Sequence, residues 1–262
     1  MKRGLLFSFL LVACMCVQAQ SERVSDVVGD YMSCDIRGNL YVVNGASLVK
    51  LDRSGNKLAN YEDFLLGDIS SIDSDNPLKI MLFYRDAGKI VFLDDKLTVI
   101  GEPLDLFSQN LQNVTLATYS TDNKIWLYDE VAKDLIAVDF HLNVISRNHL
   151  TISDLNPSQF LSLQEKKLVL VNTDAVLFFD AFGTYLNSYP VVSDTPIQVV
   201  GDHIYYTHDG TVMFYYYSQH WGSSLLAFSG ARQVLVASDS NNYYYLDKDR
   251  QLYRHPFFIP VR

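Results

Sequence analysis

Cysteine and basic residues are both scarce in this chain, and each shortage excludes a class of protein. The 262 residues include three cysteines, at positions 14, 16 and 34. The first two lie in an apolar N-terminal leader, so only Cys34 remains once the leader is removed, and no intramolecular disulfide is expected. With 21 Lys and Arg against 30 Asp and Glu, the formal net charge is -9. Nucleic acids and anionic lipids attract clustered positive charge, so no nucleic-acid partner is expected.

Long hydrophobic runs are missing after the leader. No later segment has the roughly 18 uninterrupted apolar residues of a transmembrane helix, so no transmembrane segment is expected. The leader itself has Lys2 and Arg3 followed by an apolar run and small residues, which predicts a signal peptide at residues 1–19. A second interpretation stays open, because the stretch ending at Cys14 resembles a bacterial lipobox, in which that cysteine is lipidated. Both interpretations predict export, to the periplasm or to the outer membrane, and the second adds a lipid anchor through Cys14.

Helical periodicity is missing too, and a repeat takes its place. No amphipathic stretch of 11 or more residues is present, whereas a short apolar strand recurs about every 40 residues. The six copies lie at residues 40–43, 80–83, 125–128, 168–171, 204–207 and 243–246. Their first residues are 40, 45, 43, 36 and 39 positions apart. This period is typical of the blades of a propeller.

Each repeat contains further strands. The strand after the apolar one ends in an acidic residue in four copies, and a turn follows it. The four acidic residues are Asp52, Asp94, Asp139 and Asp180. Ahead of the apolar strand lies a strand of small residues, as at 117–120, which suits the crowded centre of a propeller. Four short strands per repeat predict an all-β fold, a single six-bladed β-propeller of four-stranded antiparallel blades over residues 20–262.

Residues 38–44 (GNLYVVN) and 48–55 (LVKLDRSG) show the repeat most clearly. In these residues the chain resembles the broad superfamily of six-bladed β-propellers that includes NHL-type and related periplasmic proteins. The resemblance extends over nearly the whole chain after the leader, although it weakens toward the C-terminus. It implies a fold built of blades and does not imply a particular reaction. A ring of blades must also close, so we expect the residues after Gln20 to pair with the last blade around residues 253–258.

Catalytic signatures are missing from the sequence. It has no Trp-Asp blade ending, no paired glycines of kelch repeats, no phosphate-binding glycine loop and no G-x-S-x-G elbow. Residues 120–126 (STDNKIW) superficially resemble the Asp box of sialidase-like propellers, but Lys124 stands where glycine belongs. We therefore predict that the protein is not an enzyme and has no catalytic residues.

Aspartates recur at the ends of the predicted innermost strands. They are Asp35, Asp73, Asp122, Asp202 and Asp239. Side chains turned toward the ring axis would form an acidic ring suited to a hard cation such as calcium. Aspartate is also common in turns, where its carboxylate accepts hydrogen bonds from nearby backbone, and a repeat would place it there in every blade. We expect turn structure and no cofactor, with a calcium site as the alternative.

Aromatic residues gather in the last third of the chain. Nine of the 17 tyrosines follow residue 200, and Trp221 lies among them. Such rings favour protein interfaces or stacking on sugars, but they also fill the space between blades, which are covered on both faces. Interior packing is the first interpretation, a protein interface the second and a glycan site the third. For an interface, the predicted contact residues are Tyr205, Tyr215, Tyr217, Trp221 and Tyr244.

Export, blades and the missing catalytic motifs together predict a non-catalytic scaffold. We expect a protein-interaction propeller of the bacterial cell envelope, an accessory subunit of an outer-membrane assembly or secretion complex, with an envelope or outer-membrane protein as its partner. The alternative is a metal-dependent lactonase-like hydrolase, or a glycan-binding propeller, that uses the axial pocket. A structural or sensor propeller with an unassigned ligand is the third hypothesis.

Overall fold

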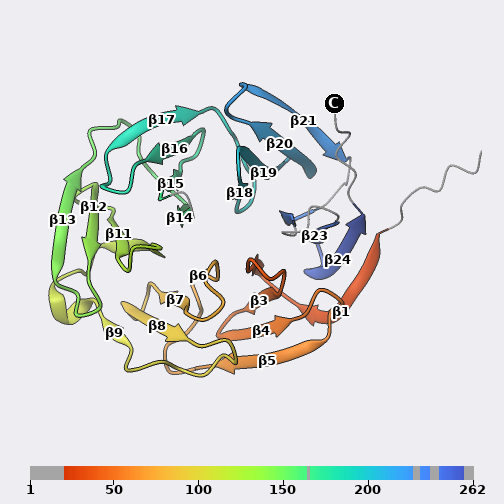
Figure 1. The fold of residues 1–262 in the computed structure, drawn as a ribbon, viewed down its shortest axis with the longest axis horizontal. Helices are drawn as coiled ribbons and strands as arrows, with labels where there is room; N and C mark the ends of the chain where they lie inside the picture. Colours follow the sequence, from red (N-terminus) through yellow and green to blue (C-terminus); the bar gives the residue numbers. More distant parts are fainter. Residues whose placement is uncertain (1–20, 164–165, 227–230, 237–241, 257–262) are drawn as a thin grey trace, which may run out of the picture.

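The computed structural model describes residues 21–163, 166–226, 231–236 and 242–256, and each sheet in these ranges has four strands. Neighbouring strands within a sheet are antiparallel, as in the pairing of β10 with β11. Six such sheets stand around a common axis as the blades of a propeller (Figure 1). The predicted fold class is therefore confirmed. The predicted signal peptide at residues 1–19, Cys14 and Asp239 lie outside the described residues, so those predictions stay predictions.

Blades one to three follow the chain from their inner to their outer strands. Blade one consists of β2 (Tyr31–Cys34), β3 (Leu40–Asn44), β4 (Ser47–Leu51) and β5 (Lys57–Glu62). Blade two consists of β6 (Ser71–Asp73), β7 (Ile80–Tyr84), β8 (Lys89–Leu93) and β9 (Leu104–Asp105). Blade three consists of β10 (Val114–Tyr119), β11 (Ile125–Asp129), β12 (Asp134–Val138) and β13 (Val144–His149). A single helical turn, η1 (Phe107–Gln109), lies between β9 and β10, and no helix among the described residues is long and apolar enough to span a bilayer.

Blades four and five repeat this order, and blade six departs from it. Blade four consists of β14 (Gln159–Ser162), β15 (Leu168–Val171), β16 (Val176–Phe179) and β17 (Tyr185–Tyr189). Blade five consists of β18 (Gln198–Val200), β19 (His203–His208), β20 (Thr211–Tyr216) and β21 (Trp221–Leu226). Blade six contains β22 (Gln233–Val236), β23 (Asn242–Leu246) and β24 (Gln251–Pro256), and its outer strand is β1 (Glu22–Val28) from the other end of the chain.

The pairing of β1 with β24 closes the ring. Glu22 lies opposite Arg254 and Arg23 opposite Tyr253, as expected from the sequence for the residues after the leader. An ion pair of 2.6 Å between Glu22 and Arg254 adds to the backbone hydrogen bonds. Since blade six takes strands from both ends of the chain, it is complete only when the N-terminal and C-terminal segments meet.

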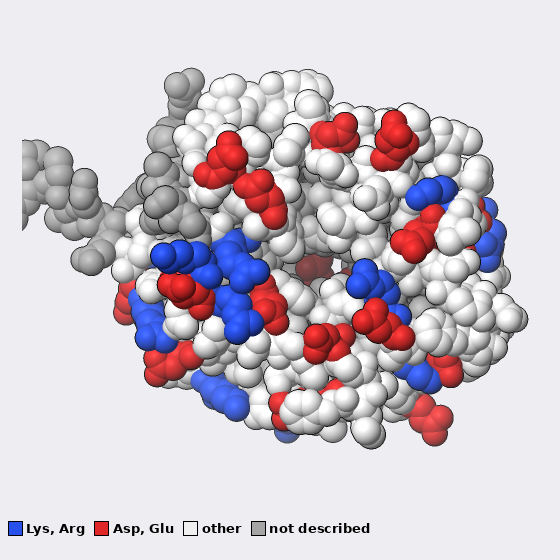
Figure 2. Space-filling model, turned by 180° about the vertical axis from the view of Figure 1, so that it is seen from behind, with Lys and Arg blue, Asp and Glu red and all other residues white. Residues whose placement is uncertain are grey.

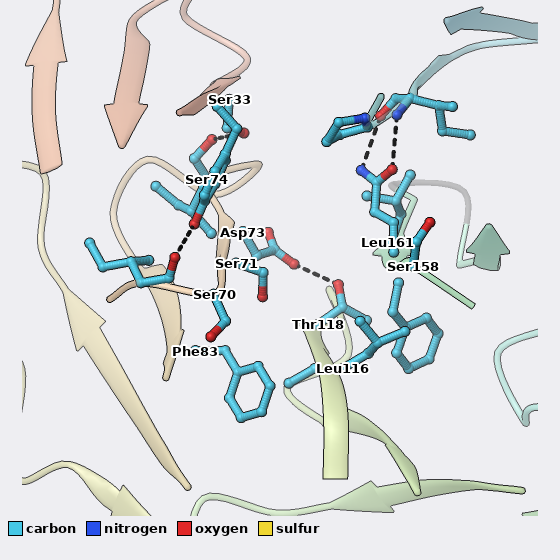
Figure 3. A pocket seen from close by; sticks show the side chains of 18 of the residues that line it. Ser33, Ser70, Ser71, Asp73, Ser74, Phe83, Leu116, Thr118, Ser158 and Leu161 are labelled. Carbon is cyan, nitrogen blue, oxygen red and sulfur yellow. Dashed lines mark hydrogen bonds between the residues drawn. The ribbon is translucent and has the colours of Figure 1, made fainter. Parts of the chain in front are cut away.

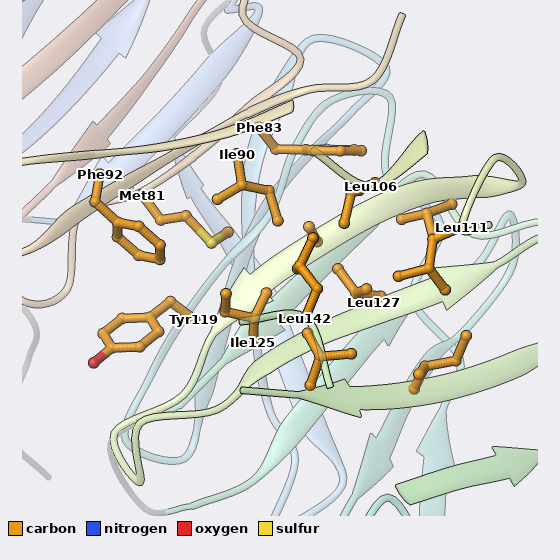
Figure 4. Packing of buried hydrophobic residues seen from close by; sticks show 14 residues of the cluster. Met81, Phe83, Ile90, Phe92, Leu106, Leu111, Tyr119, Ile125, Leu127 and Leu142 are labelled. Atoms are coloured by element: carbon orange, nitrogen blue, oxygen red, sulfur yellow. The ribbon is translucent and has the colours of Figure 1, made fainter. Parts of the chain in front are cut away.

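Apolar side chains fill the space between neighbouring blades. Strands β7 and β12 are buried along their whole length, because a blade on either side covers both of their faces. Between blades two and three, Met81, Phe83 and Ile90 pack with Leu127 (Figure 4). Strands covered on both faces carry consecutive apolar residues instead of alternating ones. This is why the second and third strands of each blade are visible in the sequence as short apolar runs.

A recurring turn joins the third and fourth strands of blades one to four. In blade one, the Asp52 carboxylate accepts hydrogen bonds from the N–H groups of Ser54 and Asn56 and from the Asn56 amide, at 2.8 to 2.9 Å. These bonds, first of all the one from the Asn56 side chain, hold the pKa of Asp52 below its usual range. Equivalent bonds are made by Asp94, Asp139 and Asp180. The acidic residue of the sequence repeat is thus a turn residue that orders the start of each outer strand.

Candidate functional site

A polar cavity of about 480 Å³ lies on the ring axis, and the innermost strands of all six blades contribute to its lining. A second cavity of about 420 Å³ adjoins it, and Cys34, Asp75 and Gln198 line both. The space-filling view shows a hollow at the centre of one face, with acidic side chains in its depth (Figure 2). Cavities of this size are in the range of small-ligand sites, so the axis is the first candidate for a functional site.

Glutamine side chains join the innermost strands of blades four, five and six to the next blade around the ring. Gln233 in β22 donates from Nε2 to the carbonyl of Met32 at 2.8 Å, and the Met32 N–H donates to its Oε1 at 2.7 Å. The equivalent pairs are Gln159 with Ile197 and Gln198 with Val236. Each amide satisfies one backbone donor and one backbone acceptor that have no sheet partner on the axial side. These glutamines therefore hold neighbouring blades together at the axis.

Hydroxyl groups and a carboxylate take this role between blades one, two and three (Figure 3). We call the boundary between two neighbouring blades at the axis a seam. The hydroxyls of Ser33 and Ser74 lie 2.8 Å apart across the seam between blades one and two. At the seam between blades two and three, the Asp73 carboxylate accepts hydrogen bonds from the Thr118 hydroxyl at 2.8 Å and from the Tyr119 N–H at 2.9 Å. Burial raises the pKa of Asp73 in spite of these donors, because the charged form loses its hydration.

A second carboxylate, that of Asp75, belongs to the same cavity wall. Its side chain is open to the water of the cavity, although the blades surround it. Burial first, and the Asp73 charge second, raise the pKa of Asp75 to about 7. Arg85 is the only basic side chain among the described residues that line this cavity. The charge that Asp75 brings to the axis therefore changes close to neutral pH.

Cys34 also faces the axis, and its environment makes it unreactive. Burial first, and then the charges of Asp75 and Asp35, raise the pKa of the Cys34 thiol to about 12. The Gln198 amide nitrogen lies 3.3 Å from its Sγ. A thiol with this pKa is protonated at neutral pH and is a poor nucleophile and metal ligand. Cys34 is therefore a small neutral wall residue in this cavity.

The predicted acidic ring is dispersed in the structure. Asp35 and Asp73 border the axial cavities, whereas Asp122 and Asp202 do not line them, and Asp239 lies outside the described residues. Only Asp73 among the four described members reaches across to the next blade.

Asp35 and Asp122 serve their own turns. The Asp35 carboxylate accepts hydrogen bonds from the N–H groups of Arg37 and Asn39, each at 2.9 Å. Asp122 pairs with Lys124 at 2.7 Å. These contacts are the turn structure that the sequence predicts as the alternative to a metal site. Of the carboxylates that line the axial cavity, Asp73 ends the innermost strand of blade two and Asp75 follows it by two positions, and Asp75 was not among the predicted residues.

Three of the five predicted aromatic contact residues are buried between blades. Tyr205, Tyr217 and Tyr244 are at most 5% exposed, because they pack in the apolar clusters between neighbouring blades. Tyr215 is half-buried against the cluster between blades four and five. Trp221, at the start of β21, is 52% exposed, and its ring meets that of Phe214 edge to face at 5.2 Å. A partner at these blades would therefore contact Trp221, and it would reach the buried rings only if the blades opened.

Exposed apolar residues on the outer strands of blades three and four were not apparent from the sequence. They are Val144 and Ile145 in β13, Phe182 in the turn before β17, and Tyr185 and Leu186 in β17. We call these five residues the apolar rim. The side chain of Asn148 in β13 donates to the carbonyl of Phe182 at 2.6 Å, so the two outer strands adjoin, and Figure 1 shows them following one another around the outside of the ring. In the sequence these residues look like core strands, since apolar character alone does not reveal which strand of a blade faces solvent.

The comparisons with known proteins show a fold and no family. No protein-family profile matches the chain, and no curated protein matches it significantly. Virginiamycin B lyase from Staphylococcus aureus is 10% identical, with 87% of this chain and 80% of that chain covered at a TM-score of 0.57. The Pan2 WD40 domain from Neurospora crassa is 8% identical, with 92% and 97% covered at a TM-score of 0.64.

A third similar structure is PorZ from Porphyromonas gingivalis, which is described as an essential bacterial surface component of the type-IX secretion system. It is 16% identical, and the match covers 90% of this chain but 34% of PorZ, at a TM-score of 0.51. The likeness to all three structures is one of fold, since a lyase, a WD40 domain and a secretion-system component share it.

Proposed function

We propose that this chain is a non-catalytic interaction propeller of the bacterial cell envelope, an accessory subunit of an outer-membrane assembly or secretion complex. The observation that carries the proposal is the apolar rim. Its five large side chains are each at least 45% exposed and belong to two adjoining outer strands and the turn that precedes one of them. Exposed apolar groups that gather on one part of a surface are typical of protein-contact sites.

The outer strand of blade one is more polar than the outer strands of blades three and four. In β5, Lys57, Asn60 and Glu62 are exposed, and Leu58 is the one large apolar side chain among the exposed residues. Phe64 and Leu65, just after β5, are exposed as well, so the difference concerns the outer strands themselves and supports a contact surface that includes those of blades three and four. Leu58 also provides a control, because it is 53% exposed in an equivalent outer strand.

The chemistry on the axis supports a non-catalytic role as well. The glutamines and Asp73 are engaged in bonds between blades, and the Cys34 thiol is protonated at neutral pH. No histidine lines the axial cavity among the described residues, so a nucleophile there would have no imidazole base beside it. The predicted signal peptide and the likeness in fold to a surface component of a secretion system support the envelope as the place of action.

The proposal is tested by charging the apolar rim. We expect the full chain, expressed in its own organism, to recover a stoichiometric envelope protein from solubilised membranes. The double variant Ile145→Glu/Leu186→Glu should lose that protein, whereas Leu58→Glu should retain it. Both variants change exposed side chains, so circular dichroism should show the same fold. Retention of the partner by the double variant, or the absence of any stoichiometric partner, would overturn the proposal.

A ligand-binding role for the axial cavity is the second candidate, and the cavity's size and acidity favour it. Asp73 and Asp75 supply oxygen ligands of the kind that a hard cation prefers, which is the chemistry of a metal-dependent hydrolase or a glycan-binding propeller. Calcium titration by calorimetry distinguishes this role from the first. Asp86 also lines this cavity, but its side chain is 92% exposed. One calcium ion per chain that is lost in Asp75→Asn but not in Asp86→Asn would favour the axial site.

A further inference from the structure

Blade five brings one imidazole and two carboxylates together on the surface, away from the axial cavity. Asp194 precedes β18, His208 is the last residue of β19, and Asp209 begins the turn to β20. One ligand atom from each of the three residues lies within 4.8 Å of the other two. Among the described residues, this is the one group of three or more His, Cys, Asp or Glu side chains gathered so closely.

The backbone holds all three residues in place. His208 pairs with Thr211 across a two-residue turn, in which Asp209 and Gly210 have φ values of 49° and 69°. Positive φ at both positions is the signature of the tight hairpin turn that Asp-Gly favours. On the other side, the Asp194 N–H donates to the carbonyl of Thr207 at 2.9 Å, next to His208. The three side chains are therefore carried by two segments that are bonded to each other.

Neither aspartate of this group pairs with a lysine or arginine among the described residues. The one ion pair in the group joins His208 and Asp209 at 3.8 Å, and it carries charge only when the imidazole is protonated. Elsewhere an aspartate does have such a partner, as in the pair of the buried Asp134 with Arg147 at 3.0 Å. Two carboxylates this close to each other repel, and they are stable together when a cation lies between them.

We propose that Asp194, His208 and Asp209 bind one divalent transition-metal ion of the zinc class. Imidazole nitrogen with two carboxylate oxygens is a set that Zn²⁺ and its neighbours accept, whereas calcium and magnesium prefer oxygen ligands alone. Ligand atoms around a tetrahedral Zn²⁺ with bonds of about 2.0 Å lie about 3.3 Å apart. Side chains that are already within 4.8 Å reach this spacing by small rotations, because those of His208 and Asp209 are exposed.

The site has an open coordination position. Its side chains lie at the surface, and those of His208 and Asp209 are 46% and 91% exposed. Three protein ligands leave the fourth position of a tetrahedral ion to water. The site does not involve the apolar rim or the axial cavity, so its test does not depend on whether the proposed function is correct.

The inference is tested on tag-free mature protein that has been stripped with a chelator and dialysed. Titration with Zn²⁺ by calorimetry should give one ion per chain, and Co²⁺ should give the visible absorption of a four-coordinate ion. The variants His208→Ala and Asp194→Asn should each weaken Zn²⁺ binding by at least ~10-fold, since even the outer partners of metal ligands have effects of that size.

The matched control is His141→Ala, which removes an exposed histidine from a turn of blade three. It should leave the affinity unchanged. Absence of stoichiometric Zn²⁺ binding, binding that His208→Ala leaves intact, or tighter binding of Ca²⁺ than of Zn²⁺ would each overturn the inference. Circular dichroism of the His208→Ala variant shows whether a loss reflects the ligand or the fold.

Discussion

The two halves of the ring are joined near the axis by different chemistry. Blades four to six use glutamine amides, as in the bonds between Gln233 and Met32. Blades one to three use hydroxyls and the carboxylate of Asp73. An amide supplies one donor and one acceptor without charge, whereas a carboxylate only accepts and brings a charge that the fold must accommodate. The comparison shows that one architecture tolerates both kinds of seam, and that, among the described residues, the ionisable groups lining the axis belong to one half.

The largest effect is expected where the amide half closes onto blade one. Tyr244 is 2% exposed and packs with Met32, Leu40 and Val42 between blades six and one. Replacing it by alanine should lower the free energy of unfolding by about 3–5 kcal/mol, the range for loss of a buried aromatic ring. Urea denaturation measures this, and Trp221→Ala is the exposed control, expected to change stability by less than about 1 kcal/mol. Equal effects of the two variants would mean that the late aromatic residues do not hold the closing blade.

An intermediate effect is expected from the glutamine seam. The variant Gln233→Ala leaves the N–H and the carbonyl of Met32 without a partner and should cost about 2–3 kcal/mol in unfolding free energy. The control Gln112→Ala removes a side chain with one exposed contact and should be nearly neutral.

The carboxylate seam should respond less to truncation than the glutamine seam. Asp73→Ala orphans the Thr118 hydroxyl and the Tyr119 N–H, but it also removes the charge that opposes ionisation of Asp75. We therefore expect a smaller loss of stability at pH 8 than for Gln233→Ala. A larger loss of stability in Asp73→Ala than in Gln233→Ala would contradict the expected difference between the two halves.

The smallest effect is a pH dependence that only the acidic half should show. The pKa of Asp75 is about 7 in the folded protein, against about 3.9 for an aspartate in an unfolded chain. The folded state therefore binds more protons between these values, and its stability falls as the pH rises from about 4 to 7. Asp75→Asn removes this loss, so we expect it to be more stable than the wild type at pH 8, by on the order of 1 kcal/mol after screening by cavity water.

Melting temperatures from pH 4 to 8 measure this difference. At pH 4, where Asp75 is protonated in the folded state, the variant and the wild type should be alike. Asp86→Asn is the control, because the Asp86 side chain is 92% exposed at the mouth of the same cavity. A constant difference between Asp75→Asn and the wild type across this range would show that Asp75 does not titrate there.

Much of the fold could be predicted because the repeat is local. Strands predicted to start at residues 40, 80, 125 and 168 start there, since each is an apolar run bounded by turn residues. The two later strands start one residue earlier than predicted, at His203 and Asn242, because these polar residues take part in the ladder opposite Tyr216 and Pro256. Pairing between strands extends past the apolar run, and the run alone does not show how far.

The candidate sites were far less predictable. Asp75 follows Asp73 by two positions in a stretch that begins like a calcium loop, yet its place in the axial wall depends on how blade two meets its neighbours. The blade-five group joins Asp194 to His208 across 14 positions, and they are brought together by the bonds of residues 193–195 to Thr207. The apolar rim could not be predicted, because the sequence does not show which strands face solvent.

By itself, the sequence determined the number of blades, their strand order and the closing role of the N-terminal strand, because short apolar runs and turn residues act over a few neighbouring positions. The tertiary structure decided which residues share the axis, which rings are buried and which apolar side chains remain exposed. These properties depend on contacts between residues about 40 positions apart, such as the bond from Gln159 to Ile197, and they arise only when the blades stand side by side.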